Sequence, residues 1–495
     1  MSNVRQNYFF KVNYIIRKLP LWRVMKNTET MMTKQWRPFI HFTPEKNWLN
    51  DPNGMVYFND MYHLFFQYNP TGDKHGNMHW GHAQSTDLVN WQEKDIAIYA
   101  DPDGLGYVFS GGAVVDVNNT SGLGDGTVPP LVATFTHHSK DEVQVQSLAY
   151  SQDGGDTWVE YANNPVIANP GLKDFRDPKV IWNEENSQWV MALAVEHFIY
   201  FYVSSNLIDW TFASKFGEGH GTHGRVWECP DLFPLTTPCG ITKWVLIVSL
   251  DPAGPNGGTG TQYFIGEFDG KKFISDHTET RWLDYGPDNY AGVTWDGLQP
   301  TSNKRIFIAW MSNWVYANDL PTNPWRGGMT LPRELTLVNS SKGIMLANLP
   351  SDDITSLKAE FALTEANTLP ESCAYEVVWK FDKSLGDNSI TFFNSEDEKL
   401  VISYVAENNE IQLDRTQSGW NEKDFGRVAT APLKMIDENT IECSIIIDQS
   451  SVEVFTEKGL TTLTSNIFPK VPYSEFTTTR TSQLECFTLI NKVTS

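Results

Sequence analysis

Three acidic residues lie in local settings that suit catalysis: Asp51, Asp177 and Glu228. Asp51 belongs to Trp48-Leu-Asn-Asp-Pro-Asn-Gly54, in which Pro52 restricts the residue before it to extended backbone. A carboxylate held in this way has the rigidity that a nucleophile needs, because displacement requires a fixed approach geometry. A structural Asx-Pro turn is the alternative, and for this motif alone it is the commoner explanation.

Asp177 repeats the Asp-Pro arrangement in Phe175-Arg-Asp-Pro178. If the two side chains met, the permanent charge of Arg176 would lower the pKa of Asp177 and keep it ionised. An ionised, oriented carboxylate can bind substrate hydroxyl groups and stabilise a developing positive charge. The alternative for this fragment is a salt-bridged turn at the surface.

Glu228 is a lone acid among apolar residues in Val226-Trp-Glu-Cys-Pro230. Desolvation disfavours the charged form of a carboxyl group, so such a residue stays protonated near neutrality, as a general acid must. Burying a charged carboxyl group in an apolar setting costs free energy, which favours a functional explanation. One ionised and one protonated carboxyl group are the pair that glycoside hydrolysis uses.

Other mechanisms find little support in the sequence. It has no Gly-x-Ser-x-Gly motif, no phosphate-binding Walker loop and no His-Glu-x-x-His motif. His79 and His82 lie three residues apart without an evident third ligand, so we expect neither a metal nor a cofactor. Aromatic side chains could instead stack on sugar rings, and the candidates are Tyr68, Trp80, Trp227 and Trp314.

The charge balance limits the possible partners. With 38 basic and 60 acidic residues the formal net charge is −22. Nucleic acids and anionic membrane surfaces need a basic footprint, so neither is expected as a partner. A neutral substrate suits this chain, although the acidity is equally explained as a means of staying soluble.

Short strand-like runs dominate the first two thirds of the chain, and a turn motif recurs among them. Three copies begin with Ser and end with Trp, and a fourth is degenerate: Ser85–Trp91, Ser151–Trp158, Ser204–Trp210 and Gly266–Phe273. In the first three, a polar turn follows one strand and the Trp opens the next. This spacing is typical of the four-stranded blades of a β-propeller. Ordinary hairpin turns in an all-β protein are the alternative.

We therefore predict an all-β protein with a propeller over residues 37–337, a polar linker over 338–355 and a β-sandwich over 356–495. Alternating apolar and polar residues, as in Tyr375–Phe381 and Val452–Thr456, favour the sandwich.

The first 36 residues are predicted to be a disordered basic extension. Residues 1–35 hold seven Lys or Arg and one acid, and charged residues and a Pro interrupt their apolar stretch, so it does not fit a signal peptide. The cysteines are scattered, which suits buried thiols in a reducing compartment: Cys229, Cys239, Cys373, Cys443 and Cys486. A cytoplasmic location is the resulting expectation.

The motifs of the three acids, in this order and spacing, closely resemble those of glycoside hydrolase family 32, the invertases, inulinases and levanases. Further matching segments are Phe109–Gly112, Asp284–Gly286, Trp314 and Asp448–Phe455. The resemblance extends over about residues 38–490.

The resemblance implies a five-bladed β-propeller followed by a C-terminal β-sandwich, with the site at the propeller axis. It implies that Asp51 is the nucleophile, Glu228 the acid/base and Asp177 a stabiliser that binds fructose hydroxyls. The residues expected to bind the fructosyl unit are Asn50, Gln67, Trp80, Phe109, Ser110, Arg176 and Trp314.

The expected activity is exo-hydrolysis of terminal β-fructofuranosyl residues in levan or inulin, with sucrose as a second substrate. Trp227–Phe233 and Trp325–Pro332 are more similar to exo-levanases and exo-inulinases than to plant-type invertases. A sucrose-specific invertase and a fructosyltransferase on the same scaffold are the alternatives. A non-catalytic fructan-binding protein would be expected to lack at least one of the three acids. The sandwich could stabilise the propeller, bind sugar or form a homodimer.

Overall fold

The computed structural model describes residues 35–298, 305–340, 342–363, 367–372, 374–433 and 439–490. The predicted basic extension falls almost entirely outside these residues, as does Cys373. Among the four cysteines described, Cys229, Cys443 and Cys486 are buried and Cys239 is exposed. In the described ranges no helix is long and apolar enough to cross a membrane.

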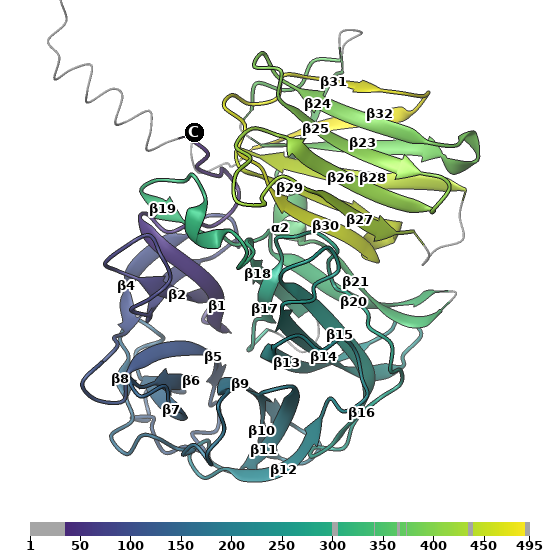
Figure 1. The fold of residues 1–495 in the computed structure, drawn as a ribbon. Helices are drawn as coiled ribbons and strands as arrows, with labels where there is room; N and C mark the ends of the chain where they lie inside the picture. Colours follow the sequence, from purple (N-terminus) through teal and green to yellow (C-terminus); the bar gives the residue numbers. More distant parts are fainter. Residues whose placement is uncertain are drawn as a thin grey trace, which may run out of the picture. The chain divides into compact units, whose positions relative to one another are not determined.

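Up to Pro350, the described part of the chain forms five antiparallel sheets that follow one another in sequence. Each contains one strand that faces a common centre (Figure 1). These inner strands are β1 (Asn47–Phe58), β5 (Tyr107–Val115), β9 (Phe175–Asn183), β13 (Val226–Thr236) and β17 (Tyr290–Thr294). The outer strands are β2 (Met61–Asn69), β3 (His79–Ser85), β4 (Gln92–Ile98), β6 (Leu131–His138), β7 (Gln144–Ser151), β8 (Val159–Glu160), β10 (Gln188–Val195), β11 (Phe198–Ser204), β12 (Thr211–Phe216), β14 (Thr242–Asp251), β15 (Gly260–Phe268), β16 (Phe273–Ser275), β18 (Arg305–Trp310), β20 (Arg333–Ser340) and β21 (Gly343–Pro350).

The inner strands contact one another in a closed ring, in the order β1, β5, β9, β13, β17 and back to β1. The two-residue strand β19 (Trp325–Arg326) strengthens the closure, because it leaves the fifth sheet and pairs in parallel with the start of β1. A closed ring leaves few free strand edges, which is how propellers protect their sheets from pairing with other chains.

The recurring turn has a physical basis. In each of the three clear copies, the Trp indole N–H donates to the backbone carbonyl three residues earlier, at 2.8–3.1 Å. The accepting residue has a positive φ in every case, and the three pairs are Trp91–Leu88, Trp158–Gly155 and Trp210–Leu207. The motif therefore fixes the same connection into the outermost strand of three successive sheets.

Beyond Lys358 the chain forms two packed sheets. One has the strand order β22-β32-β23-β28-β29-β30 and the other β27-β26-β25-β24-β31. Their bounds are β22 (Lys358–Phe361), β23 (Tyr375–Asp382), β24 (Asn388–Phe393), β25 (Lys399–Val405), β26 (Glu410–Gln417), β27 (Val428–Pro432), β28 (Thr440–Asp448), β29 (Ser451–Thr456), β30 (Thr461–Asn466), β31 (Glu475–Thr478) and β32 (Gln483–Leu489).

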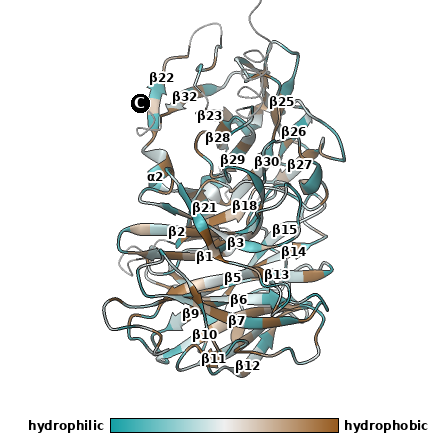
Figure 2. Ribbon diagram, turned by 90° about the vertical axis from the view of Figure 1, so that its left-hand side faces the viewer, coloured by the Kyte–Doolittle hydropathy of each residue, from teal (hydrophilic) through white to brown (hydrophobic). Residues whose placement is uncertain are grey.

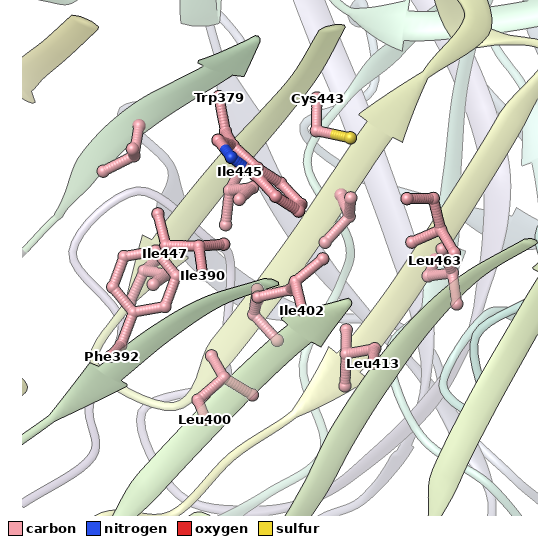
Figure 3. Packing of buried hydrophobic residues seen from close by; sticks show 14 of the residues in the cluster. Trp379, Ile390, Phe392, Leu400, Ile402, Leu413, Cys443, Ile445, Ile447 and Leu463 are labelled. Carbon is pink, nitrogen blue, oxygen red and sulfur yellow. The ribbon is translucent and has the colours of Figure 1, made fainter. Parts of the chain in front are cut away.

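The two sheets of the sandwich share one apolar core. Figure 3 shows Trp379 and Ile445 from one sheet beside Ile390 and Ile402 from the other, all fully buried. Strands of both the propeller and the sandwich carry hydrophobic and hydrophilic segments (Figure 2), as expected where one face of a sheet is buried. The predicted all-β fold, a propeller followed by a sandwich, is confirmed.

The predicted linker was wrong for most of its length. Residues 338–350 belong to the hairpin of β20 and β21, which completes the fifth sheet, and the short helix α2 (Asp352–Thr355) follows. Of the polar residues that suggested a linker, Asn339, Ser340, Lys342 and Gly343 lie at the tip of this hairpin. On either side of the tip, buried Leu337 and Met345 supply the strand pattern that the prediction overlooked.

A buried ionic network joins the propeller to the sandwich. Arg333 of β20 is fully buried and pairs with Asp284 at 2.8 Å and with Glu453 of β29 at 2.6 Å. His41 lies between Glu453, at 3.0 Å, and Asp448, at 2.8 Å. Burial alone would lower the pKa of His41, but the two carboxylates outweigh burial and raise it to about 9.

This network predicts a pH-dependent stability that replacement of His41 by Gln should remove. Because the pKa of His41 is raised, its contribution is complete below about pH 6.5 and disappears as pH rises through about 9. The wild-type advantage over His41→Gln should therefore shrink by about 3 kcal/mol between pH 6 and pH 9.5. Denaturant unfolding of both proteins across this range measures it, and a constant difference would contradict the assignment.

Candidate active site

A cavity of about 420 Å³ lies where the inner strands of the propeller come together. Asp51 enters it from β1, Asp177 from β9 and Glu228 from β13. The full lining is Asn50, Asp51, Gln67, His75, Phe109, Ser110, Gln144, Asp174, Arg176, Asp177, Arg225, Glu228, Asp251 and Trp314. The structure thus brings the three predicted acids together, although 177 residues separate the first from the last.

Every inner strand is irregular at the level of this cavity. The pairing register shifts between Leu49 and Pro52 in β1, Val108 and Gly111 in β5, Arg176 and Lys179 in β9, Glu228 and Asp231 in β13, and Tyr290 and Val293 in β17. Such bulges redirect a side chain out of the regular alternation. Proline has no N–H to contribute to a ladder and is tolerated at a bulge, which explains why a Pro follows closely after each of the three acids.

Asp51 is held by two donated hydrogen bonds. Ser110 Oγ donates to Oδ2 at 2.7 Å, and Asn50 Nδ2 donates to Oδ1 at 2.9 Å. Burial raises the pKa of Asp51, the two donors oppose this, and the nearby charge of Glu228 adds to the rise. The carboxylate is therefore oriented on both oxygens and poorly solvated.

Asp177 departs from its predicted electrostatics. Its side chain is almost completely buried, and the nearest Arg176 nitrogen is 3.9 Å from Oδ2. Burial is the largest influence, Arg176 opposes it, and Glu228 and Asp51 reinforce it, so that the pKa of Asp177 rises to about 7. The expected lowering by Arg176 was wrong in its net effect, because burial outweighs the attraction of the guanidinium group, which also pairs with Asp174, at 2.5 Å, and with Glu228.

Glu228 is less isolated than its sequence neighbours suggested. Arg176 donates to Oε1 from Nη2 at 2.7 Å and from Nε at 3.2 Å, and the Tyr290 hydroxyl donates to Oε2. The expectation of an apolar setting was therefore wrong for the carboxyl group itself. Local sequence could not show this, because Arg176 and Tyr290 come from other sheets.

Cys229 connects the acids. Its backbone N–H donates to Asp177 Oδ2 at 3.1 Å, and its sulfur lies 3.6 Å from Asp51 Oδ2 and 3.7 Å from Asp177 Oδ2. Burial, aided by the surrounding acids, raises the pKa of Cys229 well above its usual value. The thiol therefore keeps its proton and acts as a weak donor to both carboxylates.

The other predicted site residues line the cavity, with one exception. Asn50, Gln67, Phe109, Ser110, Arg176 and Trp314 are all present in its wall. Trp80 is not: it is fully buried between the first two sheets, and its indole N–H donates to the Phe109 carbonyl at 3.0 Å. Tyr68 and Trp227, suggested as stacking faces, are also core residues.

Several cavity residues were not predicted: His75, Gln144, Asp174, Arg225 and Asp251, together with Tyr290 behind Glu228. Asp251 carries a signal that could have been used, because Asp251-Pro252 repeats the Asp-Pro arrangement of the other acids. Arg225 pairs with Asp251 at 2.7 Å at the rim. Among the residues that the structure describes, no group of three or more His, Cys, Asp or Glu side chains is arranged to hold a metal ion.

Comparison with known proteins decides the family. Residues 41–348 match the glycosyl hydrolases family 32 N-terminal domain, and residues 347–489 match the family 32 C-terminal domain. The chain belongs to glycosyl hydrolase family 32. The predicted resemblance and the prediction of a glycoside hydrolase are both confirmed.

Named relatives of this family 32 chain include a levanase of Bacillus subtilis (strain 168), 44% identical over 456 residues, which cover 88% of this chain and 67% of the relative. An extracellular exo-inulinase of Aspergillus niger is 40% identical over 484 residues, covering 88% of this chain and 90% of that protein. Among solved structures, exo-inulinase from Aspergillus awamori superposes with a TM-score of 0.85 at 37% identity, covering 93% of this chain and 99% of that one.

Replacing Asp177 by Asn should stabilise this family 32 protein at alkaline pH. Because burial raises the pKa of Asp177 from 3.8 to about 7, keeping it ionised opposes folding above pH 7, and this cost disappears as pH falls towards 4. Asp177→Asn should gain up to about 4 kcal/mol at pH 8 and much less at pH 5. Thermal unfolding at both pH values tests this, and a variant less stable than wild type at pH 8 would contradict it.

Proposed function

We propose that this protein is a retaining exo-β-fructosidase that releases terminal β-D-fructofuranosyl units from fructans, with sucrose as a second substrate. The observation that carries the proposal is the meeting of Asp51, Asp177 and Glu228 in one cavity of a family 32 chain. The named relatives, a levanase and exo-inulinases, support fructan as the substrate class.

Asp51 is the nucleophile in this proposal. Hydrogen bonds from Ser110 and Asn50 fix the orientation of both its oxygens. The side chain itself lies at the bulge of β1. Attack on the anomeric C2 forms a bond from a carboxylate oxygen to C2 while the bond from C2 to the leaving-group oxygen breaks. The product is a covalent fructosyl-enzyme.

Glu228 serves as acid and then as base. In the first step its carboxyl proton goes to the leaving-group oxygen, and the carboxylate that results accepts hydrogen bonds from Arg176 and Tyr290. In the second step this carboxylate takes a proton from water as the water oxygen attacks C2 and displaces Asp51. Fructose then leaves with its original configuration.

Asp177 binds the sugar hydroxyl groups and stabilises the positive charge that develops near the ring oxygen. Its own hydrogen bond from the Cys229 N–H uses Oδ2 and fixes the direction of the carboxyl group. The raised pKa of Asp177 affects activity. Below about pH 7, only part of the empty enzyme carries Asp177 in the ionised form that charge stabilisation needs.

A neutral leaving group suits the cavity better than a phosphorylated one. Both arginines in its wall are already paired with carboxylates: Arg176 with Asp174 and Glu228, and Arg225 with Asp251. A sugar phosphate would have to compete with these acids for the positive charge.

Substitution of Asp51 by Asn should abolish turnover without unfolding the protein. The amide keeps the shape of the side chain but cannot act as a nucleophile, so kcat on sucrose or inulin should fall by more than about 1,000-fold. The matched control is Asp95→Asn on the exposed side of β4, which should keep wild-type kcat. An active Asp51→Asn protein with a normal thermal transition would refute this role.

Product analysis tests the reaction and its substrates together. With levan, inulin and sucrose compared side by side, we expect free fructose from all three and no intermediate oligosaccharides from the two fructans. In the presence of methanol, retention predicts methyl β-D-fructofuranoside as the trapped product. Cleavage of sucrose alone would refute the fructan proposal, and chain-lengthened products at high sucrose concentration would instead favour a fructosyltransferase.

A further inference from the structure

Arg415, a residue of sandwich strand β26, contacts the propeller segments that precede β17 and follow β18. It is fully buried, and its Nη1 donates to Asp288 Oδ2 at 2.5 Å while its Nη2 donates to the Tyr316 hydroxyl at 2.6 Å. Its Nε donates to the Phe425 carbonyl at 2.8 Å, and its Cζ lies 3.8 Å from the centre of the Phe425 ring. The side chain thus has a fixed position and two partners in the propeller.

These two partners are close in sequence to two residues of the candidate site. Asp288 precedes Tyr290, whose hydroxyl donates to Glu228, by two residues. Tyr316 follows Trp314, which lines the cavity, also by two residues. Arg415 therefore holds the backbone segments that carry Tyr290 and Trp314.

The two segments are also tied to each other. The Tyr316 hydroxyl donates to Asp288 Oδ1 at 2.7 Å, so that one carboxylate accepts from both Tyr316 and Arg415. Asn313 Nδ2 donates to the Pro287 carbonyl at 2.7 Å. Movement of either segment would consequently disturb the other.

Asn466, a second residue of the sandwich, also binds Asp288 and the segment after β18. Asn466 of β30 donates from its backbone N–H to Asp288 Oδ2 at 2.9 Å, and from its side chain to the Met311 carbonyl at 2.8 Å. All these groups are buried, and a buried charged pair without its partner is strongly unfavourable. The sandwich and the propeller are therefore joined by a specific polar contact immediately behind the cavity.

We propose that Arg415 is a positioning residue for catalysis: through Asp288 and Tyr316 it sets the Tyr290 hydroxyl against Glu228 and fixes Trp314 in the cavity wall. The sandwich thus helps to set the geometry of the active site. This inference rests on the proposed function, because it assigns Glu228 the part of acid and base. A guanidinium group is required, since a lysine ammonium lacks the planar fork that reaches Asp288, Tyr316 and the Phe425 carbonyl together.

The experiment compares Arg415→Lys and Asp288→Asn with the matched control Asp448→Asn. Asp448 is an equally buried carboxylate of the same interface, where it accepts from the backbone N–H groups of Phe39 and Ile40 and from His41. None of these partners belongs to the cavity wall. For each protein, thermal unfolding, kcat, KM and the pH dependence of kcat are measured with inulin or sucrose well below the unfolding temperature.

All three variants should unfold at lower temperature, because each breaks a buried polar contact. Arg415→Lys and Asp288→Asn should also lose about ten-fold or more in kcat, with a smaller change in KM, because a displaced group near the reacting atoms costs rate. Their pH dependence of kcat should also differ from that of the wild type, because the Tyr290 hydroxyl is no longer held against Glu228. Asp448→Asn should keep wild-type kcat and pH profile within about two-fold.

Two results would overturn the inference. The first is an unchanged kcat and pH profile in Arg415→Lys and Asp288→Asn, and the second is an equal loss of kcat in Asp448→Asn, which would indicate general loosening of the interface. Failure of the proposed function is recognised separately, because wild-type protein would then release no fructose and both proposals would fall.

Discussion

The charge of Arg176 is the interaction on which the rest of the site depends. Asp51, Asp177, Glu228 and Asp174 crowd into one cavity wall, and the guanidinium group pairs directly with two of them. Its positive charge opposes the burial and the neighbouring acids that raise the pKa of Asp177. The acids differ in environment: Glu228 is paired, Asp51 is hydrogen-bonded by neutral donors, and Asp177 is desolvated enough for its pKa to reach about 7. Three similar side chains thereby lie in three different electrostatic environments.

The bulged inner strands make this crowding possible. A regular strand would turn successive side chains to opposite faces, so neighbouring groups such as Asn50 and Asp51 could not both line the cavity. The extra residue in each strand allows it, and Asp177 and Cys229, which lie at the shifts of β9 and β13, have left-handed backbone. Such strained backbone persists only where the surrounding structure holds it. Here the contacts of β9 and β13 with each other and with their neighbours in the closed ring provide that support.

The sequence predicted the fold class and the members of the site better than their surroundings. Asp51 and Asp177 were singled out because a Pro follows each of them directly, at what proves to be a bulge, and Glu228 because its sequence neighbours are apolar. Trp80 was misplaced because an aromatic residue of the first sheet serves equally well as core. The partners of Glu228 could not be predicted, since Arg176 and Tyr290 lie 52 and 62 residues away. The position of Arg415 could not be predicted from its neighbours in sequence, because its partner Asp288 lies 127 residues earlier. Residues 338–350 were misread because a polar hairpin tip and a linker have the same composition.

The ring arrangement also bears on how the protein is made. Each of the five inner strands supplies one group at or behind the cavity: Asp51, Ser110, Asp177, Glu228 and Tyr290. All three acids precede residue 229 in the chain, yet β19 closes the ring only at residue 325 and the sandwich contacts follow at 415 and 466. During synthesis, domains fold in order from the N-terminus. A nascent chain therefore carries the three acids long before the strand that closes the ring and the sandwich contacts of Arg415 and Asn466 have been synthesised.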